Sequence, residues 1–268
     1  MTKRKAKTIL LVSDLHCGHR IGLTPPSHRS PAGTAHHKQQ RDLYDWWVET
    51  VSQIKPYAVM CVGDLIDGAG KKSGGSEQVT TNMIEQAYMA VECLRQVGGN
   101  PKYFGVGGTE YHTGQDCDFE EIIAREMKFV HFDDNFCAAI KSIPGVIFDI
   151  RHHLGNSSVP YGKATAILKE LVWNEVASVH EGVPEADIII RGHTHHSIGI
   201  TCPQQNGRTK SCIKLPAMEG HGSRYGKRRC SGEVHVGFAL LHIYEDKTHD
   251  FEFVLAPISI EQEKVVLI

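Results

Sequence analysis

Short apolar runs rich in β-branched residues alternate with longer helical patterns as far as residue 192. The runs are bounded by Gly, Asp or His, and the segments between them carry apolar residues at helical spacing. This alternation is typical of βαβ units, which build a largely parallel sheet covered by helices. We therefore predict strands at residues 8–12, 57–62, 102–106, 145–151 and 187–191, and helices at about 40–54, 78–97, 118–127 and 161–180.

The pattern changes in the last quarter of the chain. Residues 211–215, 234–244 and 250–255 are further apolar runs with no convincing helix between them. They predict antiparallel strands, which we expect to complete a second sheet. The preferred architecture is one α/β domain over residues 1–268, with two packed sheets, helices outside both, and a β-rich C-terminal part from about residue 211.

Composition excludes several classes of protein. With 41% hydrophobic and 22% charged residues, the chain resembles an ordinary globular protein. No apolar run is long enough to span a membrane, and the basic N-terminus leads into a short strand without a cleavage-like site, so we expect a cytoplasmic protein. The eight cysteines contain no C-x-x-C pair, which argues against a zinc ribbon or a redox dithiol. The net charge of -2 indicates no general attraction to nucleic acid.

Three of the predicted strands end in side chains that commonly bind metals. Asp14 and His16 follow the first strand, Asp64 follows the second, and His193 and His195 follow the strand at 187–191. Ligands of open α/β sheets bind at the carboxyl ends of the strands, where the loops converge. Residues two apart on an extended segment project to the same side, so each D-x-H or H-x-H pair can reach one centre. The three strand ends together predict a metal site.

These motifs resemble the signature of the calcineurin-like metallophosphoesterase superfamily, which is D-x-H, G-D, G-N-H-D/E, a lone strand-end His, and G-H-x-H. Asp14 to His16, Gly63-Asp64 and Gly192 to His195 match that signature, and the resemblance spans most of the chain. It implies a four-layer α/β/β/α sandwich of two mixed sheets. It also implies two divalent metal ions, the first of which is bound by Asp14, His16, Asp64 and His195.

The resemblance further implies that Asp64 bridges to a second ion held by His193 and the lone His. His152 and His153 both follow the strand at 145–151 and are candidates for that lone His. We favour His152, since in relatives with a similar paired-His stretch the first His is the ligand.

The third motif departs from the family pattern. Thr109 stands where the family has its Asn ligand, in the stretch Gly108 to His112. We expect Glu110 to supply a carboxylate to the second ion instead, and His112 to protonate the leaving group. This G-T-E-x-H variant resembles a phage-encoded branch of the superfamily, as does the Pro-rich segment at 22–26. Asp67 could orient a ligand, although its Gly-Asp-x-x-Asp-Gly setting favours a turn.

The expected chemistry follows from two ions about 3.5 to 4 Å apart, which lower the pKa of a bridging water and clamp the attacking and leaving oxygens. The resemblance implies a dinuclear metal-dependent phosphohydrolase in which a metal-bridging hydroxide attacks a phosphate ester, with Asp64 and His112 as catalytic residues. Mixed imidazole and carboxylate ligands favour Mn, with Fe or Zn as alternatives, over Mg or Ca.

A long irregular loop at about residues 17–40 follows the first motif and carries Pro, Gly, Arg and several His residues. Loops of this length are uncommon in compact domains and are often functional, so we expect an active-site loop. It favours a phosphodiesterase or nuclease acting on a phosphate-ester substrate such as nucleic acid or a nucleotide. A phosphomonoesterase and a degenerate metal-binding module without catalysis are the alternatives. No membrane partner is expected, the oligomeric state stays open, and a phage-encoded protein would act in the host cytoplasm.

Overall fold

Two mixed β-sheets form the centre of the molecule in the computed structural model, which describes residues 5–34, 36–114, 118–140, 143, 145–155, 157, 159, 162–204, 207–220 and 234–257. Sheet one contains, in spatial order, β11 (His249–Leu255), β10 (Gly237–Tyr244), β1 (Ala6–Val12), β2 (Ala58–Val62), β3 (Lys102–Val106) and β4 (His131–Asp133). Sheet two contains β5 (Phe136–Ala139), β6 (Ile147–Arg151), β7 (Ile188–Arg191), β9 (Thr209–Lys214) and β8 (Ile198–Pro203). In sheet one β1 to β4 are parallel, and β10 runs antiparallel between β1 and β11. In sheet two β6, β7 and β9 are parallel, and β5 and β8 are antiparallel strands at the two edges.

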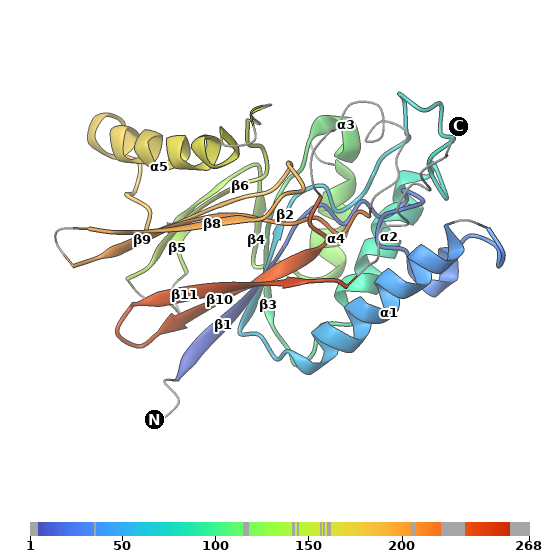
Figure 1. The fold of residues 1–268 in the computed structure, drawn as a ribbon, viewed down its shortest axis with the longest axis horizontal. Helices are drawn as coiled ribbons and strands as arrows, with labels where there is room; N and C mark the ends of the chain where they lie inside the picture. The colour runs from blue at the N-terminus through green and yellow to red at the C-terminus, as the bar shows by residue number, and fades with distance from the viewer. Residues whose placement is uncertain are drawn as a thin grey trace, which may run out of the picture.

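The two sheets pack face to face with helices on both outer faces (Figure 1). The alternation along β1 explains this arrangement, because Ile9 and Leu11 join the core between the sheets while Leu10 and Val12 join the core under the helices. Sheet one is covered by α1 (His37–Gln53), α2 (Met83–Leu94) and α4 (Asp118–Glu126), and sheet two by α5 (Lys163–His180). The four-layer α/β/β/α sandwich expected from the sequence is confirmed.

The C-terminal strands divide between the sheets, which corrects the expectation that they complete the second sheet together. Only β9 joins sheet two, where it runs parallel to β7. The later strands β10 and β11 join sheet one, and β10 pairs antiparallel with β1 from Ala6↔Tyr244 to Leu11↔Ala239. The pairing places Ala239 and Leu241 in the core between the sheets. The apolar pattern of β10 is compatible with either sheet, so its position is set by the tertiary pairing with β1.

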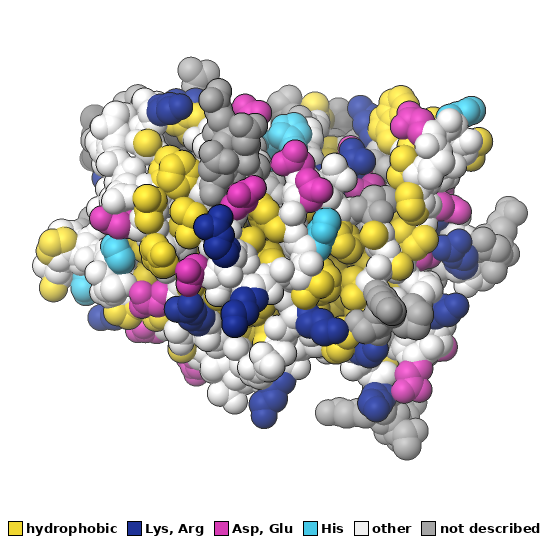
Figure 2. Space-filling view, turned by 180° about the vertical axis from the view of Figure 1, so that it is seen from behind, with side chains coloured by type: hydrophobic (Ala, Val, Ile, Leu, Met, Phe, Trp, Pro, Cys, Tyr) yellow, Lys and Arg dark blue, Asp and Glu magenta, His cyan; other side chains and the backbone are white. Residues whose placement is uncertain are grey.

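Several short elements carry too little periodicity to be predicted from the sequence. They are β4, β5, β8, the 3-10 helix η1 (Pro26–His28) and the one-turn helix α3 (Glu110–Thr113). No helix within the described ranges is long and apolar enough to cross a membrane. On the face shown in Figure 2, Lys and Arg side chains are interspersed with acidic and apolar ones.

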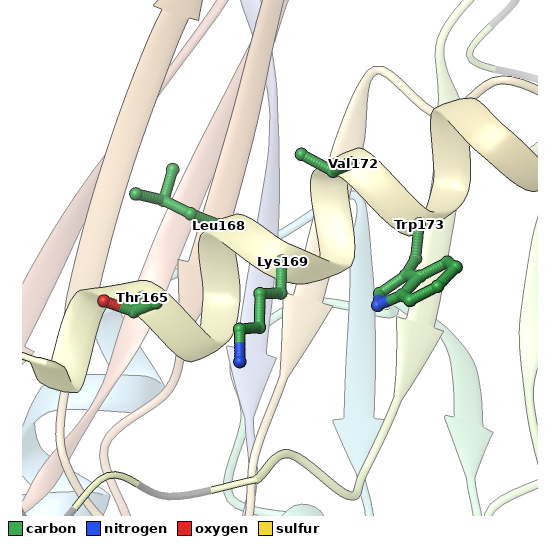
Figure 3. Close-up of a pocket in the computed structure, with 5 residues that line it drawn as sticks. All are labelled: Thr165, Leu168, Lys169, Val172 and Trp173. Atoms are coloured by element: carbon green, nitrogen blue, oxygen red, sulfur yellow. The ribbon is translucent and has the colours of Figure 1, made fainter.

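Helix α5 contacts sheet two through an apolar cluster around Ile167 and through a set of polar side chains. Arg191 of β7 is 1% exposed and pairs with Asp149 at 3.0 Å and with Glu170 of α5 at 2.7 Å. Asn174 of α5 accepts a 2.8 Å hydrogen bond from the Ala186 amide. Further ion pairs join Lys210 of β9 to Glu175 and Glu185. On its outer side α5 exposes apolar residues, including Leu168, Val172 and Trp173, that line a shallow hollow (Figure 3).

Candidate metal centre

The loops after β1, β2 and β7 converge at one edge of the sandwich, and five of their residues have a left-handed backbone. Seven non-glycine residues of the described chain have positive φ, and the five in these loops are Asp14 (φ 54), His16 (φ 44), Asp64 (φ 51), His193 (φ 71) and His195 (φ 52). This conformation is uncommon for L-residues and concentrates at functional sites. The pairs therefore converge through strained turns, and not through the extended backbone assumed from their two-residue spacing.

Glycines allow the loops to approach one another without side chains between them. A Cβ added at Gly63 would lie 2.7 Å from the ring of His152. One added at Gly108 would overlap the carboxylate of Asp64, and one at Gly192 would overlap the Ser13 hydroxyl. The G-D and G-H-x-H motifs need glycine because of this close contact.

Asp14, His16 and His195 form the first group of potential ligands, with their donor atoms within 4.8 Å of one another. The Nε2 atom of His195 lies 3.2 Å from Asp14 Oδ1 and 3.2 Å from His16 Nε2. Asp14 is fully buried, and its other oxygen accepts a 3.0 Å hydrogen bond from the His193 amide. The first and last predicted motifs therefore meet in space.

Asp64, His152 and His193 form a second group within the same 4.8 Å limit. The Nε2 atom of His152 lies 2.9 Å from Asp64 Oδ2 and 4.0 Å from Asp14 Oδ1. His153 is exposed, and its ring lies 4.7 Å from the ring of His193. The structure thus brings His152, and not His153, to the carboxylates of Asp14 and Asp64.

Asp64 also belongs to a third group, with His16 and His112. It therefore faces ligand atoms on two sides, as a bridging carboxylate would. Its Oδ1 atom accepts hydrogen bonds from the amide and the hydroxyl of Thr109, at 2.6 and 2.9 Å. The residue that replaces the usual Asn thus donates to the shared carboxylate.

Four of the histidines are held at Nδ1 by acceptors outside the cluster. Two of them donate to backbone carbonyls, His112 Nδ1 to Asp67 O at 2.9 Å and His152 Nδ1 to Val62 O at 2.7 Å. The other two lie against carboxylates, His16 Nδ1 at 3.0 Å from Asp67 Oδ1 and His195 Nδ1 at 3.2 Å from Glu219 Oε2. Such partners set the tautomer and the ring orientation of metal-binding histidines. The Nε2 atoms of His16, His152 and His195 consequently face carboxylates, at 3.8 Å from Asp14, 2.9 Å from Asp64 and 3.2 Å from Asp14.

The donor set fits divalent metal ions. Asp14 Oδ1 and His152 Nε2 are buried, and although they lie 3.2 Å from His195 Nε2 and 2.9 Å from Asp64 Oδ2, neither contact has hydrogen-bond geometry within the described part of the chain. Buried polar atoms without a partner are costly, and a cation placed between these two would satisfy both. Imidazole and carboxylate donors suit Mn, Fe or Zn.

The electrostatics favour ionised carboxylates. Burial opposes the ionisation of Asp14 and Asp64, but the charge of His152 together with the other histidine charges and hydrogen bonds outweighs it. The pKa of Asp64 falls to about 2, and that of Asp14 falls well below its usual value. Burial also works against a protonated His152, yet Asp64 and Asp14 raise its pKa to about 9. Burial and the neighbouring His152 lower the pKa of His193 to about 4. The two carboxylates thus stabilise positive charge between them.

Glu110 and His112 of the third motif differ in their position relative to the ligand groups. Glu110 is exposed on α3 and belongs to none of the three ligand groups found among the described residues. Its assignment as a ligand stays a prediction, which the geometry does not favour. His112 faces Asp64 and His16, and although burial opposes a proton on it, the hydrogen bond to Asp67 raises its pKa.

Sequence reasoning missed or underrated three residues around the centre. Asp67 accepts from both His16 and His112, so it orients two rings as well as belonging to a turn. Glu219 lies against the Nδ1 atoms of His195 and His19, at 3.2 and 3.3 Å. Glu120 is buried beside the Asp64 loop. Glu219 and Glu120 belong to no motif, so the sequence holds no local signal for either.

The long loop after the first motif folds against the centre. Its first part is tied to the Asp64 loop by an isolated parallel bridge between Cys17 and Ile66. The side chain of His19 reaches Glu219, and Arg20 lies 3.4 Å from Glu77. Helix α1 begins at His37, so the irregular part is slightly shorter than the predicted 17–40.

One family model matches most of this chain. The profile of the calcineurin-like phosphoesterase family matches residues 7–197. Among solved structures, a Thermotoga maritima protein is similar at 13% identity and a TM-score of 0.37, covering 93% of this chain and 99% of its own. A metallophosphoesterase from Sphaerobacter thermophilus is similar at 12% identity and a TM-score of 0.40, covering 93% of this chain and 88% of its own. A search of the curated proteins found no match.

Proposed function

This chain belongs to the calcineurin-like phosphoesterase family, and from that premise we propose that it binds two divalent ions and hydrolyses phosphodiesters as a nuclease-type enzyme. Metal-dependent hydrolysis of phosphate esters is the activity that the family implies. The dinuclear centre, the identity of the ions as Mn and the preference for diesters are the finer parts of the proposal.

The position of Asp64 is the observation that carries the proposal. Its carboxylate belongs to one ligand group with His152 and His193 and to another with His16 and His112. Asp14 lies within 4.0 Å of both His152 and His195, so the ligand groups adjoin. When bound, two divalent ions would supply a water of lowered pKa and positive charge for the phosphoryl oxygens. Asp64 would hold both ions, and Asp14 and the histidines would complete their shells.

His112 is placed to move a proton at its Nε2 atom. Its Nδ1–H is held by the carbonyl of Asp67 at 2.9 Å, and its ring lies 4.7 Å from the ring of His16. The free ring nitrogen therefore lies beside the ligand cluster, where a leaving oxygen would depart. A positioned general acid of this kind contributes about 10²- to 10⁴-fold to the rate.

A cationic turn beside His112 supports a diester with a charged leaving group. Exposed Lys71 and Lys72 lie on this turn, and the Lys72 amide donates a 2.9 Å hydrogen bond to Tyr111 Oη. The Lys72 ammonium lies 4.5 Å from the centre of the Tyr111 ring, and Tyr111 in turn contacts His112 edge-on. Lysine binds phosphate as a point charge, so the turn would favour a nucleic acid strand continuing past the cleaved bond.

Hydrolysis assays on three substrates test the proposal. Purified protein loaded with Mn²⁺ is expected to cleave bis-p-nitrophenyl phosphate faster than p-nitrophenyl phosphate and to degrade single-stranded DNA. A monoester rate equal to or above the diester rate would favour the phosphomonoesterase alternative.

The third candidate, a metal-binding module without catalysis, is motivated by Thr109, whose hydroxyl donates to Asp64. The second ion would then have one protein ligand fewer than in relatives with Asn. Elemental analysis distinguishes this candidate, since one ion or none per chain together with no hydrolysis of any ester would support it.

We also propose a phage or prophage origin and action in the host cytoplasm, from the resemblance of the G-T-E-x-H variant and the segment at 22–26 to a phage-encoded branch. We further propose that residues 1–268 form a single domain and that the substrate is a nucleic acid or a nucleotide. Comparison of the neighbouring genes in the source genome would test the origin, because a phage gene is expected to lie among other phage genes.

A further inference from the structure

Glu120 is a fully buried carboxylate that joins the two loops around Asp64. It lies on α4 at 0% exposure and accepts hydrogen bonds from two backbone amides, that of Leu65 at 2.6 Å and that of Gly108 at 2.7 Å. No Lys or Arg within the described ranges forms an ion pair with it. Burial and the neighbouring Asp64 raise the pKa of Glu120 to about 7, while the two amide hydrogen bonds and the charge of His152 favour its ionised form.

The two amides lie on either side of the Asp64 carboxylate. Leu65 follows Asp64 directly, so one oxygen of Glu120 holds the backbone that carries this ligand. Gly108 precedes Thr109, whose amide and hydroxyl both donate to Asp64 Oδ1. The other oxygen of Glu120 therefore holds the segment that orients the Asp64 side chain.

The two loops are in close contact where Gly63 and Gly108 meet. A Cβ at Gly108 would overlap the Asp64 side chain and backbone, and a Cβ at Gly63 would lie 2.7 Å from the Gly108 Cα. A shift of either loop would therefore move the carboxylate relative to His152 and His16.

A neutral carboxamide could not accept both of these hydrogen bonds. A carboxylate accepts through both oxygens, whereas a carboxamide of the same shape accepts through one and presents an NH₂ group to the second amide. Burying a carboxylate without a cation is costly, and an apolar residue would fill this interior position at lower cost if only packing mattered.

We propose that Glu120 is a positioning residue, which holds Asp64 and Thr109 in the one arrangement that lets the Asp64 carboxylate be shared by two metal ions. The proposal rests on the dinuclear centre of the proposed function. It predicts that Glu120 acts on metal binding without touching metal or substrate.

The test compares Mn²⁺ binding by the wild-type protein and Glu120→Gln, measured by calorimetric titration and by electron paramagnetic resonance. Loss of a partner that orients a ligand typically weakens metal affinity about 10- to 100-fold. We expect a loss of this size for the more weakly bound ion, and the spectrum of a coupled Mn pair should give way to that of an isolated ion.

Asn174→Ala is the matched control, because Asn174 is also a buried polar side chain that accepts from a backbone amide. It lies on α5, in the layer outside sheet two, and belongs to none of the ligand groups. The variant is expected to lower stability while leaving both Mn²⁺ affinities unchanged. If Glu120→Gln does not fold, Glu120→Asp takes its place, since its shorter carboxylate keeps the charge but reaches only one of the two amides.

The outcomes separate this inference from the proposed function. Wild-type protein that binds no pair of Mn²⁺ ions would overturn the proposed function. A wild-type pair that Glu120→Gln retains at the same affinity would overturn only the role of Glu120. Equal losses of affinity in Glu120→Gln and Asn174→Ala would also overturn that role, because general destabilisation would then account for both.

Discussion

The metal centre and the layer under α5 both bury charged side chains, but they neutralise them differently. Under α5 every buried charge of the Arg191 network has an opposite charge from the protein itself, since Arg191 pairs with Asp149 and Glu170. Lys210 is likewise paired with Glu175 and Glu185. In these two networks each buried cation is therefore neutralised by carboxylates of the protein itself.

At the metal centre carboxylates and imidazoles from three ligand groups face one another, and no Lys or Arg of the described chain pairs with Asp14 or Asp64. Asp14 Oδ1 and His152 Nε2 are buried without hydrogen bonds among the described residues, and five residues of the converging loops have positive φ. Buried charge alone does not mark a functional site. A buried atom without a hydrogen bond does not mark one either, since Asp149 Oδ1 under α5 is another. The left-handed backbone of five ligand residues and the three groups of carboxylates and imidazoles distinguish the metal centre from the layer that supports the fold.

The largest expected effect is at the centre, in Asp64→Asn. The variant loses the shared negative charge, and with it several kcal/mol of metal-based stabilisation of the transition state. Such a loss corresponds to a fall of about 10³-fold or more in kcat/KM on bis-p-nitrophenyl phosphate. Because Asp64 also pairs with His152 at 2.9 Å, unfolding in urea is measured for both proteins and the rates are compared only where both are folded. A variant with more than a tenth of the wild-type rate would remove Asp64 from the mechanism.

Arg191→Met should show the opposite pattern. Removing the cation leaves Asp149 and Glu170 uncompensated, which costs about 3–5 kcal/mol of the free energy of unfolding, while Mn²⁺ affinity stays at the wild-type value. Urea denaturation and Mn²⁺ titration at low temperature measure the two quantities. The double variant Arg191→Met with Asp149→Leu is the control, and it should recover part of the lost stability. A lower Mn²⁺ affinity in Arg191→Met would mean that the layer under α5 also supports metal binding.

His112→Ala is expected to have an intermediate effect that depends on the substrate. A general acid matters most when the leaving group is a poor one, so methyl p-nitrophenyl phosphate and DNA should differ in their sensitivity. We expect about a 10²-fold loss in kcat on DNA and a much smaller loss with p-nitrophenolate as leaving group. Equal losses on both substrates would argue against proton donation by His112.

The smallest expected effect concerns Lys214, the one member of the α5 layer for which the described residues provide no hydrogen bond or ion pair. It is 1% exposed, and burial followed by the charge of Lys163 lowers its pKa to about 8. Between this value and the ordinary pKa of about 10.4, the unfolded chain binds more protons than the folded one, so stability rises with pH. Below pH 8 both states are protonated and the full cost of the buried charge applies.

Lys214→Met should therefore raise the melting temperature at pH 7 by about 2–4 °C, for a gain of about 1 kcal/mol. The gain should shrink between pH 8 and pH 10.4, which thermal melts at pH 7 and pH 10 would measure. A gain that does not change with pH would mean that the ammonium is not responsible. A loss of stability at pH 7 would mean that Lys214 has a stabilising partner.

The sequence by itself determined the parts of this protein that depend on local pattern. Short apolar runs predicted the central strands β1, β2, β3, β6 and β7, because parallel strands that are buried on both faces consist of nearly continuous apolar residues. Helical spacing of apolar residues predicted the helices that cover them. The motifs after β1, β2 and β7 indicated Asp14, Asp64 and His195, since parallel strands bring their carboxyl ends to one edge whatever lies between them.

Only the tertiary structure decided which side chains complete the site. The choice between His152 and His153 depends on how the chain turns after β6, and the exposure of Glu110 depends on the single turn of α3. Glu120 and Glu219 reach the centre from elements distant in sequence, as β10 reaches sheet one. These contacts are set by packing between distant segments, and no local periodicity encodes which distant segment a residue meets.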